Sequence, residues 1–144
     1  MATVHVIATT FEGTREALRT AIPLAAGSGA GVTLVVPQVV PYAMEIDAPL
    51  PSTAFFVKRY QQIVDELGGS ATIEVCHCRS LTDIVERLAA PGATIVVGGP
   101  AGRWLTSPEE RFAGKLAGLG ARVVFVASGT NVTQRRIAPF AAVW

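Results

Sequence analysis

The chain has 144 residues, of which 50% are hydrophobic and 16% charged, and its formal net charge at pH 7 is +1. A chain of this length and apolar content is expected to fold as one domain with a substantial core. The small net charge and the scattered lysines and arginines argue against nucleic-acid binding. No apolar run approaches the roughly 18 residues of a membrane span, and the chain enters a strand without a secretion signal, so we expect a cytoplasmic protein without membrane attachment.

The first half of the chain alternates continuous apolar runs, typical of strands buried on both faces, with stretches that have helical spacing of apolar residues. We expect strands over residues 4–8, 32–36 and 71–76 and helices over 14–26 and 53–67. Pro23 is expected to kink or loosen the first helix. The second strand either stops before Pro37 or continues past it to Val40, because proline removes a ladder donor.

In the second half, Ser80 and Ser107 each begin a predicted helix, with an acidic residue three positions later that completes a capping box. Strands are expected over 93–97 and 122–127. Five strands alternating with four helices predict right-handed crossovers and a doubly wound α/β fold with a parallel sheet covered on both faces. Residues 1–128 would form this domain, and 129–144 a C-terminal tail.

A glycine-rich stretch follows the strand expected over 93–97 and includes Gly98, Gly99, Gly102 and Arg103. Glycine permits positive φ and lets a ligand approach the backbone, and ligands of open α/β sheets bind beyond the carboxyl ends of the strands. This stretch is therefore the first candidate binding loop. The alternative is that the glycines only shape a turn.

Other polar groups are expected at the same edge of the sheet. Thr9 and Thr10 follow the first strand and can hydrogen-bond a ligand, and Val40 ends the longer version of the second strand. Arg79 follows the third strand and is a candidate anion contact, although a solvated arginine is the more common outcome.

Cys76, His77 and Cys78 also fall near this edge. In an extended strand the two thiols face one side and the imidazole the other, whereas structural zinc needs four ligands. A metal site and a reactive thiol are both weaker interpretations than small buried cysteines beside a surface histidine. With Ser80 and Ser107 assigned to helix caps, the sequence contains no catalytic set, and we expect no enzyme activity.

The run Ile95-Val96-Val97-Gly98-Gly99-Pro100-Ala101-Gly102-Arg103, the helix after it and the strand Arg122-Val123-Val124-Phe125-Val126 resemble the C-terminal half of the universal stress protein family. The resemblance implies an adenine nucleotide alpha hydrolase-like three-layer sandwich. Its five-stranded parallel sheet would have the order 3-2-1-4-5, and a homodimer would form through the last strand. Many members bind ATP through a loop of Gly, two residues, Gly, nine residues, and Gly followed by Ser or Thr.

Only the first half of that loop is present, as Gly99 and Gly102. Depending on the alignment, the second half falls on Phe112-Ala113 or on Glu109-Glu110, and Thr9 stands where ATP-binding members often carry Asp. Glutamates at a helix N-terminus oppose the positive potential that would hold a triphosphate. We therefore expect a changed or lost ligand, with ATP or another adenine nucleotide a less favoured cofactor.

The tail ends in the apolar residues Ile137, Phe140, Val143 and Trp144, which a protein does not leave in water. They are expected to pack on the chain's own sheet or to cross to a second subunit, and the resemblance favours a homodimer. The sequence thus predicts a non-catalytic stress-response or small-ligand-binding module. The alternative is a dimeric interaction protein with a vestigial nucleotide pocket.

Overall fold

A computed structural model describes residues 3–40, 42, 53–89, 93–100, 107–128 and 134–137, the last four by their backbone alone. Strands and helices alternate along the chain as the sequence predicts. The elements are β1 (Thr3–Ile7), α1 (Phe11–Ser28), β2 (Gly31–Val39), α2 (Thr53–Glu66), β3 (Thr72–Cys78), α3 (Leu81–Leu88), β4 (Thr94–Pro100), α4 (Pro108–Gly118), β5 (Arg122–Ser128) and β6 (Gln134–Ile137). None of the described helices is long and apolar enough to cross a membrane.

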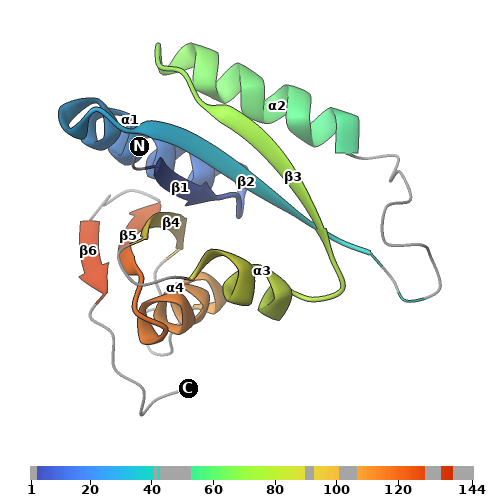
Figure 1. Ribbon diagram of the computed structural model, residues 1–144. Coiled ribbons are helices and arrows are strands. Elements are labelled where there is room, and N and C mark those ends of the chain that lie inside the picture. The colour runs from blue at the N-terminus through green and yellow to red at the C-terminus, as the bar shows by residue number, and fades with distance from the viewer. Residues whose placement is uncertain are drawn as a thin grey trace.

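The sheet has the strand order β3-β2-β1-β4-β5-β6. Its first five strands are parallel, which confirms the predicted order 3-2-1-4-5. The sixth strand was not predicted: β6 pairs antiparallel with β5, with Val123 opposite Ile137. This part of the tail therefore lies on the chain's own sheet and covers the outer edge of β5 (Figure 1).

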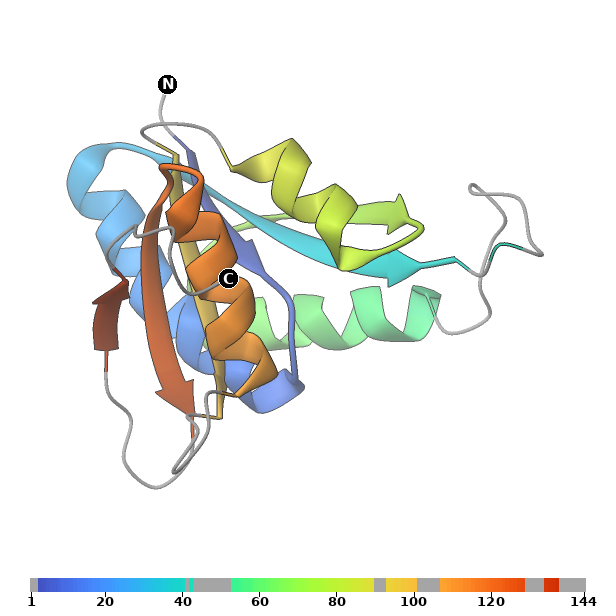
Figure 2. The ribbon, with the colours of Figure 1, turned by 90° about the horizontal axis from the view of Figure 1, so that it is seen from below.

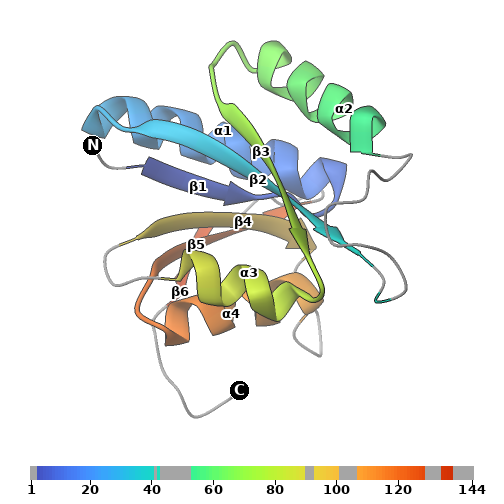
Figure 3. The ribbon, with the colours of Figure 1, turned by 45° about the vertical axis from the view of Figure 1, so that its right-hand side comes forward.

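Helices cover both faces of the sheet. α1 and α2 lie on one face and α3 and α4 on the other (Figure 3). Successive side chains of β1 and β4 are therefore buried on alternate faces of the sheet, in two different cores. Val6 and Val96 pack with Leu18 of α1, whereas Ile95 packs with Leu116 of α4. The two-layer cover explains why these strands are apolar without alternation.

α1 is longer at both ends than the sequence predicts. It begins at Phe11 because the side chain of Thr10 accepts a hydrogen bond from the Gly13 amide and so caps the helix. Pro23, which is exposed, neither ends the helix nor shortens it, and the helix stops only at Gly29, whose φ of 71° is readily adopted by glycine.

β2 follows the longer of its two predicted versions, and β3 and β4 extend beyond their predicted ends. β2 continues through Pro37 to Val39, and β3 continues to Cys78 beside it, so this pair projects past the end of β1 (Figure 2). β4 includes Gly98 and Gly99, which pair with Val126 and Ala127 of β5. The prediction that these two glycines belong to a loop was therefore wrong, because the ladder with β5 holds them extended.

Candidate ligand site at the carboxyl edge of the sheet

A pocket of about 180 Å³ lies at the carboxyl end of β1. This is the point at which the strand order reverses, because β1 is flanked by β2 and by β4, and open α/β sheets bind their ligands there. The lining comes from the end of β1, from β2 and from the first turns of α3 and α4: Ile7, Ala8, Thr9, Pro37, Leu81, Pro108, Glu109 and Phe112.

Two larger hollows are weaker candidates. One, of about 600 Å³, lies at the opposite edge between the ends of α1 and α2, and none of the described residues that line it is ionisable. The other, of about 750 Å³, has described lining residues from α2 alone and is an open strip of helix surface. The smaller pocket is preferred because it lies at the topological switch point.

Thr9 connects the end of β1 to three other elements. Its backbone N–H donates to Thr14 Oγ1 (3.0 Å), its hydroxyl donates to the Gly98 carbonyl (2.5 Å), and its carbonyl accepts from the Tyr60 hydroxyl (3.3 Å). The hydroxyl proton is thereby used within the protein. What Thr9 can offer a ligand is an acceptor oxygen.

Gly98 and Gly99 are both buried, and each lies under another part of the chain. A Cβ on Gly98 would overlap the carbonyl oxygen of Gly13 in α1. A Cβ on Gly99 would lie 2.6 Å from Cγ of Glu109 in α4. The absence of side chains lets both helices approach β4 closely, so the side chain of Glu109 lies over the backbone that the sequence predicted would receive a ligand.

The first turn of α4 carries two carboxylates with different surroundings. Glu110 closes a capping box: its Oε1 accepts from the Ser107 amide (3.0 Å), and the Ser107 hydroxyl accepts from the Glu110 amide (3.1 Å). This confirms the predicted cap. Oε2 of Glu109 is buried without a hydrogen-bond partner anywhere in the described part of the chain. Among the described residues that line the pocket, Glu109 is thus the one ionisable group, and it is acidic.

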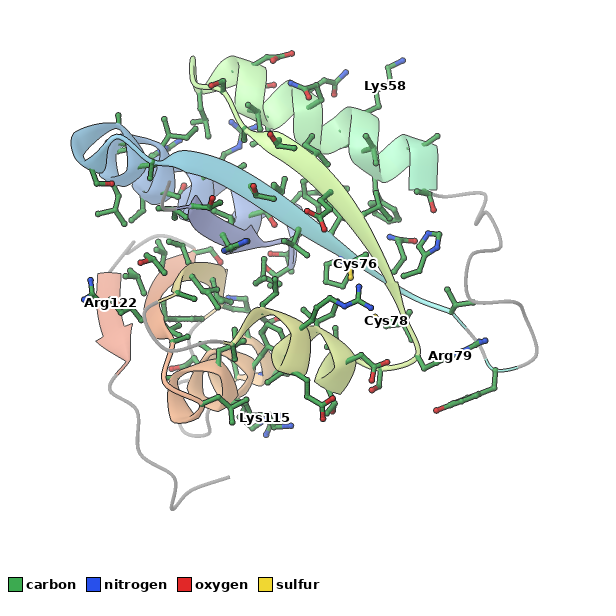
Figure 4. The ribbon with its side chains drawn as sticks, viewed as in Figure 1. Lys58, Cys76, Cys78, Arg79, Lys115 and Arg122 are labelled. Atoms are coloured by element: carbon green, nitrogen blue, oxygen red, sulfur yellow. The ribbon has the colours of Figure 1, made fainter. Side chains whose placement is uncertain are left out.

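Thr10, Val40 and Arg79 do not line the pocket. The Thr10 side chain is occupied by its cap on α1. The Arg79 guanidinium donates to the Val40 carbonyl (3.3 Å) and lies over the Tyr42 ring at 5.3 Å (Figure 4). Arg79 therefore fastens the projecting ends of β2 and β3 together, and its contact with an anion stays a prediction. Gly102 and Arg103 lie outside the described residues.

The two cysteines are buried on the same face of β3, as the strand pattern predicts. Burial raises the pKa of the Cys78 thiol; Cys76 and Asp83 raise it further, and Arg87 opposes the shift. Nη1 of Arg87 lies 2.8 Å from Sγ of Cys76. Within the described ranges no three metal-binding side chains come together. The structure thus places these thiols in the core beneath α3.

Sequence reasoning identified Thr9 as a site residue but missed most of the lining. Leu81 was not singled out, Phe112 entered only as a possible position in the incomplete nucleotide loop, and Glu109 was treated only as an obstacle to phosphate. Their convergence depends on where α3 and α4 begin relative to β1, and the only advance signal was the pair of capping boxes that marks those starts.

Comparison with known proteins supports the fold. The structure of a universal stress protein from Archaeoglobus fulgidus superposes on this chain with a TM-score of 0.55 at 12% sequence identity. The match covers 85% of this chain and 93% of the other. At this identity the likeness shows a shared fold, which is the class of fold that the sequence resemblance implied. No sequence model of a known family matches the chain, and no curated protein matches it in sequence.

Proposed function

We propose that this chain is a non-catalytic, universal stress protein-like module that binds a small ligand in the pocket at the end of β1 and does not bind ATP there. The observation that carries the proposal is the position of Glu109, which lies over Gly99 and lines the pocket. A role in a stress response rests on the fold likeness alone and is part of the proposal.

The lining favours binding over catalysis. Among the described lining residues, Glu109 is the one ionisable side chain, and the Thr9 hydroxyl donates its proton to a backbone carbonyl. A nucleophile needs an adjacent base, and acid–base catalysis needs groups with complementary protonation states. A single carboxylate among apolar walls provides neither.

The same features oppose a nucleoside triphosphate. Phosphates bind at helix N-termini through free amides and a favourable dipole. At the start of α4, the Glu110 amide is already bonded to Ser107, and the carboxylates of Glu109 and Glu110 add negative charge. The pocket of about 180 Å³ is also below the ~300–1,000 Å³ of sites for drug-sized ligands.

The experiment is a thermal-shift panel with ATP, ADP and AMP, with and without Mg²⁺, run beside a ligand-observed NMR screen of one-ring fragments. We expect no nucleotide to raise the melting temperature and some fragments to bind. A ligand at a hundred times its Kd adds about 2.7 kcal/mol of stability, so ATP binding would be seen easily. A rise with ATP would refute the exclusion of nucleotides.

Matched variants locate the binding site. Leu81→Trp places a large ring at the pocket mouth, where Leu81 is 48% exposed, and Leu119→Trp places the same ring at the far end of α4, where Leu119 is 52% exposed. Fragment binding should be lost in the first variant and kept in the second. Equal binding by both variants would show that the ligand binds elsewhere.

A second candidate is a dimeric interaction protein with a vestigial pocket. The observation that favours it is that the Glu109 side chain covers Gly99. A side chain that occupies the place of a phosphate is what we expect in a protein that has lost its nucleotide. Under this function no fragment binds and the purified chain is a dimer. Because β6 covers β5, a dimer formed by sheet extension would use the outer edge of β6.

A further inference from the structure

The buried carboxylate oxygen of Glu109 has no partner, and this indicates the chemistry of the missing ligand. Oε2 is shielded from solvent, and no described group donates a hydrogen bond to it. A buried acceptor without a donor is costly, and more so when it carries charge. A group that brings N–H donors and positive charge into the pocket would remove that cost once the carboxylate turns its buried oxygen toward that group.

Around Glu109 the pocket walls are apolar. Ile7, Leu81 and Phe112 contribute hydrocarbon, and Pro37 and Pro108 have no amide hydrogen to donate. Thr9 adds an acceptor, because its hydroxyl proton is bonded to the Gly98 carbonyl. Among the residues that the structure describes, the side chains of the lining therefore offer acceptors and hydrophobic surface, and no cationic side chain.

The size of the pocket limits the ligand. Its volume is about 180 Å³, and an engineered apolar cavity of ~150 Å³ in another protein binds benzene. One six-membered ring with a short substituent therefore fits, whereas a nucleoside does not.

From these three observations, and on the basis of the proposed ligand-binding function, we propose that the pocket binds a small primary amine with a compact apolar body. The ammonium group binds the carboxylate of Glu109, which lines the pocket and turns its buried Oε2 toward the ligand, and the Thr9 hydroxyl oxygen is available as a second acceptor. The apolar body packs against Leu81 and Phe112. An anion of the same shape is rejected, because it would meet the Glu109 carboxylate at close range in a site of low dielectric constant.

The test uses three probes of nearly equal shape: benzylamine, benzyl alcohol and benzoate. Each is titrated into the full chain at pH 7, where benzylamine is protonated, and binding is followed by amide chemical shifts of Leu81 and Phe112. We expect benzylamine to bind about tenfold or more tightly than benzyl alcohol, because hydrogen bonds to charged groups exceed neutral ones by about this factor. Benzoate should not bind.

Glu109→Gln removes the charge and keeps the shape, and Glu86→Gln makes the same change on the exposed face of α3. The first variant should lose the preference for benzylamine while still binding benzyl alcohol, which also shows that its pocket is folded. The second should behave as the wild type. Equal affinity for the amine and the alcohol, or tighter binding of benzoate, would overturn the amine assignment and leave the ligand-binding function standing. If no probe shifts the resonances of Leu81 or Phe112, both proposals fail.

Discussion

Gly98→Ala is the most sensitive single test of the packing that forms the site. α1 approaches β4 closely at Gly98: a Cβ there would overlap the Gly13 carbonyl oxygen, lie 2.8 Å from its carbonyl carbon and lie 3.2 Å from Cβ of Ala17. Unstrained carbon–carbon contacts are ~3.5–4.0 Å, so α1 must move by about 1 Å. That movement also pulls on the bond from the Thr9 hydroxyl to the Gly98 carbonyl.

Overpacking a core costs about 1–3 kcal/mol, and the upper end applies because the colliding atoms belong to backbone that cannot change rotamer. We therefore expect Gly98→Ala to lower the free energy of unfolding by about 3 kcal/mol, which corresponds to a fall of roughly 10 °C in melting temperature for a chain of this size. The assay is urea unfolding followed by far-UV circular dichroism, with the slope m checked for constancy.

Gly27→Ala is the matched control. Gly27 lies in the last turns of α1, and a Cβ there meets no atom within 4 Å. Because alanine is the better helix former, this variant should gain about 0.5–1 kcal/mol. Opposite signs for the same substitution would establish the close contact. If Gly98→Ala changed stability by less than about 0.5 kcal/mol, the value typical of an inconsequential surface change, the reasoning would be refuted.

Four further outcomes are expected. Ser107→Ala removes the cap of α4 and should cost about 1 kcal/mol in urea unfolding; no loss would contradict the capping box. Glu109→Met replaces a buried unpartnered carboxylate oxygen by hydrocarbon and should raise stability by about 1 kcal/mol, whereas a fall would indicate that the carboxylate has a stabilising partner. Burial raises the pKa of Cys78 above its ordinary 9.0 and that of Tyr60 above 10.0. Above these values the folded state therefore keeps two protons that the unfolded state releases. The free energy of unfolding should be constant below pH 9, fall as the pH rises through 9 because of Cys78, and fall further above pH 10 because of Tyr60. The fall above pH 10 should be absent in Tyr60→Phe. Light scattering after size-exclusion chromatography tests the predicted homodimer, and a monomer at all concentrations would remove it.

The positions of the helices and strands could be predicted from the sequence, because they depend on residues that are close together along the chain. Apolar runs such as 93–97 defined strands, and Ser107 with Glu110 defined the start of α4 to the residue, because a capping box joins groups only three positions apart. The alternation of strands and helices then implied a parallel sheet covered on both faces, and the structure has one.

Contacts between distant segments were decided by the tertiary structure alone. Gly98 was expected in a loop, but pairing with β5 extends the strand through it, and the approach of Gly13 explains why it has no side chain. Glu109 comes to lie over Gly99 because the start of α4 packs against the end of β4. Arg79 and Val40 are 39 positions apart, and they meet because β2 and β3 both extend beyond the end of β1. Spacing along the chain carries no signal for such pairs, since they form only when the core brings whole elements together.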